Sequence, residues 1–246
     1  MPASTKRDPK TERPSARRTF APAVREREDS RKAPQRTISD RSDPRTLSTD
    51  DWIRVAKSVL IREGIAAVKI DRIARESGVT RGGFYWRFKS RNHLLQVLLD
   101  DWRQTNTSPI IEALLGEGTP AERFDRLARL WIEERDFSPD YDDAVRNWSA
   151  IDPKVAAVVR NVDNERIDAF ERLYRDYGYG SDEALVRARI TYYHQVGYYA
   201  LGVRESAERR RMLNPLFQEI LTGFSRSDPA AMARDRKRRS TGSSKT

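Results

Sequence analysis

Hydrophobic residues recur every three or four positions along most of the chain between residues 47 and 224, which predicts an all-α protein. Ser48 and Asp51 have the spacing of a capping box with aspartate in place of glutamate, and Gly64 can end the helix that follows. The apolar stripe between them consists of Trp52, Val55, Ala56, Val59 and Leu60. We therefore expect an amphipathic helix between Ser48 and Gly64.

The stretch 70–95 predicts two short helices joined by a tight turn. Ile70, Ile73 and Ala74 have helical spacing, Gly78 is suited to the left-handed conformation that ends a helix, and Thr80 is suited to cap the next one. On a helical wheel the second short helix turns Phe84 and Phe88 inward. Its opposite face carries Gly82, Gly83, Tyr85 and Trp86.

This arrangement is typical of a helix-turn-helix, whose second helix enters the major groove of DNA. Arg81 is placed to pair with a guanine edge, because an arginine there can donate to both O6 and N7. The candidates for phosphate contacts are Thr80, Tyr85, Lys89 and Arg91. Each glycine in a helix costs about 0.8–1 kcal/mol relative to alanine. Gly82 and Gly83 therefore indicate either close approach to DNA or close packing of two helices.

These residues resemble the signature of the TetR family of transcriptional regulators. The matching segments are Ile73-Ala74, Gly78-Val79-Thr80, Phe84-Tyr85-Trp86-Arg87-Phe88 and Arg91. The sequence departs from the family pattern at Lys69, where threonine is the common helix cap, and at Arg91, where lysine is commoner. The resemblance covers about 50 residues. It implies a three-helix DNA-binding head, at residues 47–95, joined to a larger helical ligand-binding and dimerisation body, at residues 96–224.

The body shows further helical signals. From Arg91 a helix with a leucine stripe leaves the head, and the sequence from Thr119 to Glu122 combines a threonine cap, a proline and a glutamate. A short helix is expected at 141–150 and a long one from Asp152-Pro153 to about Tyr177. Ser181 is then the expected cap of a helix at 182–205. Pro215 predicts that the last helical segment, 207–221, is broken.

Two kinds of partner follow for the body. Apolar residues cover more than one face of the predicted 182–205 helix, which favours a homodimer, and the resemblance implies a four-helix interface made by the last two elements. Aromatic residues with polar groups suit a small amphipathic effector, although helical aromatic stripes are also ordinary core. The candidate pocket residues are Trp131, Phe137, Tyr141, Trp148, Phe170, Tyr174, Tyr192, His194 and Tyr198.

Charge is distributed unevenly over the 246 residues, whose net charge is +10. Residues 1–46 carry 13 basic and 7 acidic side chains, and residues 225–246 carry 7 and 2. The head is also basic, whereas residues 104–224 have 16 basic and 21 acidic side chains. We expect both tails to be disordered basic segments, which either reach DNA phosphates or are only solvated.

Other functional classes find little support. The chain has no cysteine, its two histidines are far apart, and Gly178 and Gly180 follow no strand, so we expect no catalytic or metal site and no cofactor. No apolar run suits a membrane span or a signal peptide, which favours the cytoplasm.

The sequence thus predicts a homodimeric DNA-binding regulator. We expect a repressor that a small-molecule effector releases from a palindromic double-stranded DNA operator. The alternative is a helical protein-interaction factor that uses DNA as a scaffold and takes no small ligand.

Overall fold

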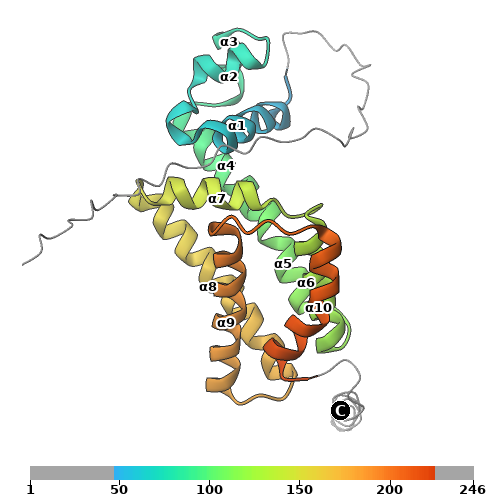
Figure 1. The fold of residues 1–246 in the computed structure, drawn as a ribbon. Coiled ribbons are helices and arrows are strands. Elements are labelled where there is room, and N and C mark those ends of the chain that lie inside the picture. Colours follow the sequence, from blue (N-terminus) through green and yellow to red (C-terminus); the bar gives the residue numbers. More distant parts are fainter. Residues whose placement is uncertain (1–46, 225–246) are drawn as a thin grey trace, which may run out of the picture. The chain divides into compact units, whose positions relative to one another are not determined.

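The computed structural model describes residues 47–224, and these residues contain helices but no strand. Both predicted basic tails, 1–46 and 225–246, lie outside the described residues. The head consists of α1 (Thr49–Glu63), a 3-10 turn (Ile65–Ala67), α2 (Ile70–Glu76) and α3 (Arg81–Arg87) (Figure 1). The predicted capping box at the start of α1 is present, because the Ser48 side chain accepts from the Asp51 amide and the Asp51 carboxylate accepts from the Ser48 amide.

An aromatic cluster holds the three helices of the head together. Phe84 and Phe88 are buried, as predicted, and their ring centroids lie 5.2 Å apart in a stacked arrangement. The Trp52 ring of α1 meets Phe84 edge-on at 5.6 Å. Such aromatic pairs add to the free energy of burial itself, so α3 is fixed against α1 by its inward face.

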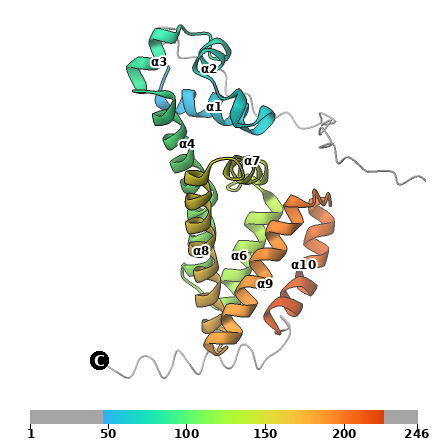
Figure 2. The same cartoon turned by 90° about the vertical axis from the view of Figure 1, so that its left-hand side faces the viewer.

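The body is built from α4 (Arg91–Asn106), α5 (Ser108–Leu115), α6 (Pro120–Glu133), α7 (Pro139–Ser149), α8 (Pro153–Asp176), α9 (Ser181–Ala200) and α10 (Ala207–Thr222). The long helices α8 and α9 pack against each other, and α10 packs against α6 and α9 (Figure 2). The predicted capping box at the start of α6 is present between Thr119 and Glu122.

One hydrophobic cluster crosses the predicted boundary at residue 95. It joins the buried residues of α1, α2 and α3 to Trp102 of α4, to Tyr141 and Trp148 of α7, and to Val155 at the start of α8. The Tyr141 hydroxyl donates to the Leu98 carbonyl oxygen at 2.6 Å. Helices α4 and α7 therefore share a core with the head instead of only following it in the chain.

Three local predictions were wrong. The cap of α9 is Gly180, and Ser181 is the first helical residue, so the start lies one residue earlier than its side chain suggested. The same helix ends at Ala200, before Gly202 with its φ of +64°. α10 continues through Pro215, which is exposed. Proline has no N–H to donate to the carbonyl oxygen one turn earlier, but on the exposed side of the helix that oxygen can bond to water, so the helix does not have to break.

Candidate nucleic-acid interface and ligand cleft

The turn between α2 and α3 has the geometry that the sequence predicts. Gly78 has a φ of +67°, and the Val79 amide donates to the Ala74 carbonyl at 3.0 Å, which closes the end of α2. Thr80 is the N-cap residue of α3, but its side chain makes no capping hydrogen bond. Because the exposed Thr80 hydroxyl does not cap the helix, it can still serve as a phosphate donor.

The outward face of α3 exposes large aromatic side chains. Trp86 is 91% exposed and Tyr85 is 50% exposed, whereas Phe84 in the same helix and Phe88 directly after it are buried. An exposed aromatic pair on a short helix gains little for folding, since burial is the source of the hydrophobic stabilisation. These two side chains are therefore available for contacts outside the chain.

The two glycines of α3 have no packing role in the described chain. A Cβ atom added at Gly82 would come no closer than 3.6 Å to a neighbour, and one added at Gly83 would meet only Trp52, at 4.0 Å. Both distances are ordinary van der Waals contacts. Packing between helices of this chain therefore does not require glycine at either position, and close approach of α3 to DNA stays a prediction.

Arg81 lies at the start of α3 with an acidic neighbour that sequence spacing did not reveal. Its guanidinium is 3.5 Å from the Asp71 carboxylate and donates to the Tyr85 hydroxyl at 3.4 Å. The hydrogen bond to Tyr85 and the charge of Asp71 raise the pKa of Arg81 above its ordinary value. Both Arg81 and Asp71 are mostly exposed, so a DNA base or phosphate can replace these weak contacts.

Arg91 has a structural role that the sequence did not predict. Its Nε donates to the Val68 carbonyl oxygen at 2.6 Å and its Nη2 donates to the Ile65 carbonyl oxygen at 3.1 Å. These bonds tie the start of α4 to the 3-10 turn of the head. A phosphate contact by the N–H groups that remain stays a prediction, as does the contact predicted for the exposed Lys89.

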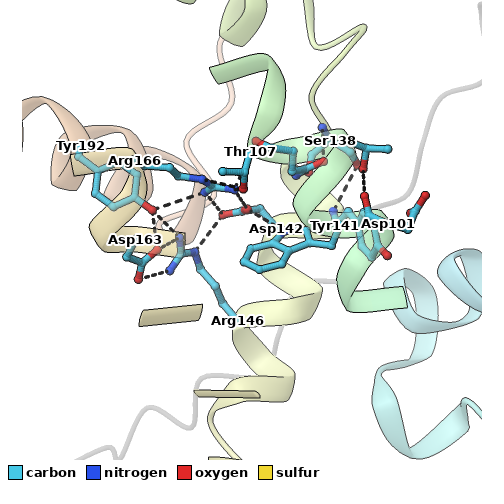
Figure 3. A network of polar contacts seen from close by, with 12 residues as sticks. Asp101, Thr107, Ser138, Tyr141, Asp142, Arg146, Asp163, Arg166 and Tyr192 are labelled. Carbon is cyan, nitrogen blue, oxygen red and sulfur yellow. Dashed lines mark hydrogen bonds and ion pairs between the residues drawn. The ribbon is translucent and has the colours of Figure 1, made fainter. Parts of the chain in front are cut away.

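A buried network of charged groups links α4 to the rest of the body (Figure 3). At its centre the Asp142 carboxylate accepts from the Trp102 indole at 3.0 Å, from Arg166 at 3.0 Å and from Arg146 at 2.9 Å. Arg146 also donates to Asp163 at 2.7 Å. The network therefore joins α4, α7 and α8 through contacts that sequence spacing cannot show.

The ionised form of Asp142 is the stable one in this network. Burial by itself would raise the pKa of the carboxyl group, but the positive charges and hydrogen bonds of Arg166 and Arg146 outweigh it and lower that pKa. Arg166 is only 1% exposed. A buried ion pair of this kind adds little net stability as a unit but is costly to break.

A partly open cleft with a volume of about 70 Å³ lies between α6, α9 and α10. Three of the predicted pocket residues, Trp131, His194 and Tyr198, line it. Burial lowers the pKa of His194, which keeps its imidazole neutral at pH 7. The cleft therefore combines aromatic walls with a few polar groups, which is the composition of many small-molecule sites.

The other six predicted pocket residues do not line this cleft. Tyr141 and Trp148 belong to the core shared with the head, while Phe137, Phe170, Tyr174 and Tyr192 belong to the core of the body. The tyrosine hydroxyls are used internally: Tyr174 bonds to Thr191 at 2.6 Å and Tyr192 donates to Asp163 at 2.6 Å. This cleft does not support their assignment to an effector pocket, because a polar group on an aromatic ring also serves a buried hydrogen bond.

Sequence reasoning missed most of the cleft wall. The residues concerned lie on α6, on α9 and on the last segments of the body; they are Phe124, Ala128, Ile132, Thr191, Gln195, Glu205, Arg210, Asn214, Phe217 and Leu221. The helical spacing of Asn214, Phe217 and Leu221 was available as a signal. Pro215 hides this signal, because an internal proline predicts a broken helix.

Neither a metal site nor a membrane span is found in the described part of the chain. Within residues 47–224, no group of three His, Asp or Glu side chains could hold a metal ion. No helix in the same range combines the length and apolar character that a bilayer crossing requires.

Residues 53–98 match the family described as bacterial regulatory proteins, tetR family. Over 47 residues the chain is 40% identical to the HTH-type transcriptional regulator SrpR of Pseudomonas putida, which is 19% of this chain and 22% of that protein. Over 54 residues it is 37% identical to TtgR of the same species, which is 22% of this chain and 26% of that protein. The chain thus aligns with about a quarter of the length of these curated relatives.

Solved structures resemble the fold over a longer stretch. A regulator of the TetR/AcrR family from Thermobifida fusca has a TM-score of 0.52 at 20% identity, over 72% of this chain and 98% of that one. The ketosteroid transcriptional regulator KstR2 of Mycobacterium tuberculosis has a TM-score of 0.51 at 15% identity, over 73% and 95%. These relatives are transcriptional regulators and not enzymes. Residues 53–98 thus carry the sequence of the tetR family of bacterial regulatory proteins, and the described chain is similar in fold to regulators of the TetR/AcrR family.

Proposed function

We propose that the protein is a homodimeric transcriptional repressor that binds a palindromic DNA operator through α3 and leaves it when a small effector binds the body. The outward face of α3 is the observation that carries the proposal. It exposes Tyr85 and Trp86 beside two glycines, and no contact within the described chain requires glycine at either position. A protein that acts on DNA in this way is expected to work in the cytoplasm.

The contacts with DNA follow from this placement. α3 enters the major groove with its first residues nearest the bases, so Arg81 exchanges Asp71 and Tyr85 for a guanine edge. Gly82 and Gly83 let the helix backbone approach closely. Thr80, Lys89 and the released Tyr85 hydroxyl donate to phosphates, and Trp86 makes apolar contacts in the groove.

The homodimer is supported by two exposed apolar stripes on the last two helices. Val186, Ile190 and Tyr193 follow one face of α9 and are each more than half exposed. Met212, Leu216 and Ile220 do the same on α10. Contiguous exposed apolar surface of this kind marks an interface, and a second copy of the chain would cover both stripes. Two heads then read half-sites about 34 Å apart.

Sedimentation equilibrium tests the homodimer. Ile220→Asp places a charge in the α10 stripe and should shift the protein from dimer to monomer. Ile151→Asp is the matched control, since Ile151 is 73% exposed against 67% for Ile220 but lies between α7 and α8. Equal dimer content in both variants would refute this interface.

Release by an effector requires that the ligand bind one arrangement of the two heads more tightly than the other. The cleft between α6, α9 and α10 is the candidate site, because two of its three walls are the helices with the exposed stripes. A ligand there acts beside the proposed interface.

Selection of bound fragments from the source genome tests the whole proposal. The purified protein is incubated with the fragments at about 0.15 M salt, which weakens non-specific phosphate contacts, and the bound DNA is sequenced. One palindrome enriched at a few promoters is the expected result. Featureless enrichment together with a stable protein partner would favour the interaction factor instead.

A further inference from the structure

Two side chains in the wall of the α6–α9–α10 cleft have hydrogen-bond donors without an acceptor. The indole Nε1 of Trp131 and the amide Nε2 of Gln195 are buried and have no partner in the described chain. The two residues are 8% and 9% exposed. Buried donors are almost always paired in folded proteins, so two unpaired donors in one cleft wall require an explanation.

The charged residues of the cleft wall already have partners. Arg210 donates to the Glu134 carboxylate at 2.7 Å and to the Trp131 carbonyl oxygen at 2.7 Å. The Glu205 carboxylate accepts from the Tyr198 hydroxyl at 3.2 Å. An anion would find no uncommitted cation here. An ammonium group could donate to the Glu205 carboxylate, but it has no acceptor and would leave the N–H groups of Trp131 and Gln195 unpaired.

The walls otherwise suit a flat apolar body. Phe124, Trp131 and Phe217 line the cleft, and the Phe217 ring lies 5.1 Å from the neutral imidazole of His194. One water needs roughly 10–15 Å³ of such space. The volume of about 70 Å³ therefore admits a group of the size of a single ring.

We infer that the cleft binds an uncharged ring compound that carries a carbonyl or similar oxygen, and that this oxygen accepts hydrogen bonds from Trp131 and Gln195. The inference rests on the proposed function, in which the body takes a small effector, and names the chemical class of that effector. Both donor nitrogens are buried in the described chain, so the inference requires that they become accessible from the cleft when the ligand binds.

Matched probes test the class of ligand without DNA. Titration calorimetry of the full chain is carried out with acetophenone, which has a carbonyl oxygen, and with ethylbenzene, which has the same ring and no acceptor. Each neutral hydrogen bond corresponds to about 2- to 12-fold in affinity, so acetophenone, which accepts two, should bind tighter by a factor of roughly 5 to 150. Benzoate and benzylamine, the two charged probes, should bind more weakly than acetophenone.

Two variants assign the preference to the donors. Trp131→Phe keeps an aromatic ring without the N–H, and Gln195→Leu keeps the approximate volume without the amide. Each should reduce the preference for acetophenone, while the affinity for ethylbenzene stays within about twofold and reports that the cleft is intact. Trp86→Phe makes the same chemical change on the exposed face of α3 and should leave the preference unaltered.

A wild-type protein that binds both neutral probes equally, binds neither up to their solubility, or prefers a charged probe overturns the inference. So does a preference that persists in both variants. If a variant does not fold, the ¹⁵N-labelled wild-type protein decides: acetophenone should shift one tryptophan indole N–H proton resonance further downfield than ethylbenzene does. Operator selection with ligand-free protein tests the proposed DNA-binding function separately. A failure to select an operator would refute that function without changing the outcome of the ligand titrations.

Discussion

The substitution Gly82→Ala should stabilise the protein and weaken its binding to DNA. An added Cβ at this position comes no closer than 3.6 Å to a neighbour, the Thr80 hydroxyl oxygen, so it introduces no internal clash. Alanine is favoured over glycine in a helix by about 0.8–1 kcal/mol. Because Gly82 lies in the first turn of α3, we expect a gain of roughly 0.5–1 kcal/mol in the free energy of unfolding.

The effect on DNA has the opposite sign. If the backbone at Gly82 lies against the DNA, a methyl group there overfills the contact and costs about 1–3 kcal/mol, as in other well-packed sites. This range corresponds to a loss of roughly 5- to 150-fold in operator affinity. Urea unfolding followed by circular dichroism measures the gain, and fluorescence anisotropy with the selected operator at constant salt measures the loss.

Gly197→Ala is the matched control for the helical effect. Gly197 lies inside α9, and a Cβ added there meets nothing within 4 Å. It should gain similar stability without losing DNA affinity, and sedimentation equilibrium checks that it leaves the proposed dimer intact. If Gly82→Ala gains stability and binds the operator as tightly as the unchanged protein, the close approach of α3 to DNA is refuted.

The remaining predictions concern base reading, the head and two buried groups. Arg81→Ala should cost about 1–3 kcal/mol of operator binding and relax the preference at one base pair, which selection from a randomised operator detects; an unchanged preference would contradict base reading by Arg81. Arg91→Lys should lower the free energy of unfolding, measured in urea, by about 1–3 kcal/mol, because lysine cannot reproduce both hydrogen bonds to the carbonyl oxygens. Reduced DNA affinity at unchanged stability would indicate a phosphate contact instead. The folded chain holds the pKa of Asp142 below its ordinary 3.8, so the unfolded state takes up the proton first as the pH falls. The free energy of unfolding should therefore decrease as the pH drops below about 5. Asp142→Asn should reduce this decrease in urea titrations at several pH values. Burial also lowers the pKa of His194 below 6.5, so stability should begin to decline as the pH falls through 6.5, and His194→Gln should remove that part of the pH dependence.

The head could be predicted from the sequence because its signals are local. Capping boxes act over three residues, the left-handed turn needs only Gly78, and the inward face of α3 follows from the spacing of Phe84 and Phe88. Arg91 is different. Its carbonyl partners lie 23 and 26 residues earlier in the chain, and no periodicity connects a guanidinium to a main-chain oxygen at that distance.

The cleft was harder to predict because residue type does not distinguish a core tyrosine from a pocket tyrosine. Tyr174 and Tyr192 have the same amphipathic rings as Tyr198, but their hydroxyls have partners from distant parts of the chain. Gln195 gave no signal at all, since a single amide on a helix is more often exposed. The side-chain amide of Gln195 is buried where α10 packs against α6 and α9, and burial is what makes its lack of a hydrogen-bond partner costly.

Four consecutive residues of α9 place this helix in three environments at once. Ile190 and Tyr193 are exposed on the proposed dimer stripe, Thr191 lines the cleft, and the Tyr192 hydroxyl donates to Asp163 in the charged network. That network continues through Arg146 and Asp142 to the Trp102 indole of α4, the helix that also shares a core with the head. A ligand that moves α9 must therefore either strain buried ion pairs, which are costly to break, or shift the helices that they join. Since α4 is one of those helices, we expect the second route to change the spacing of the two heads in the proposed dimer.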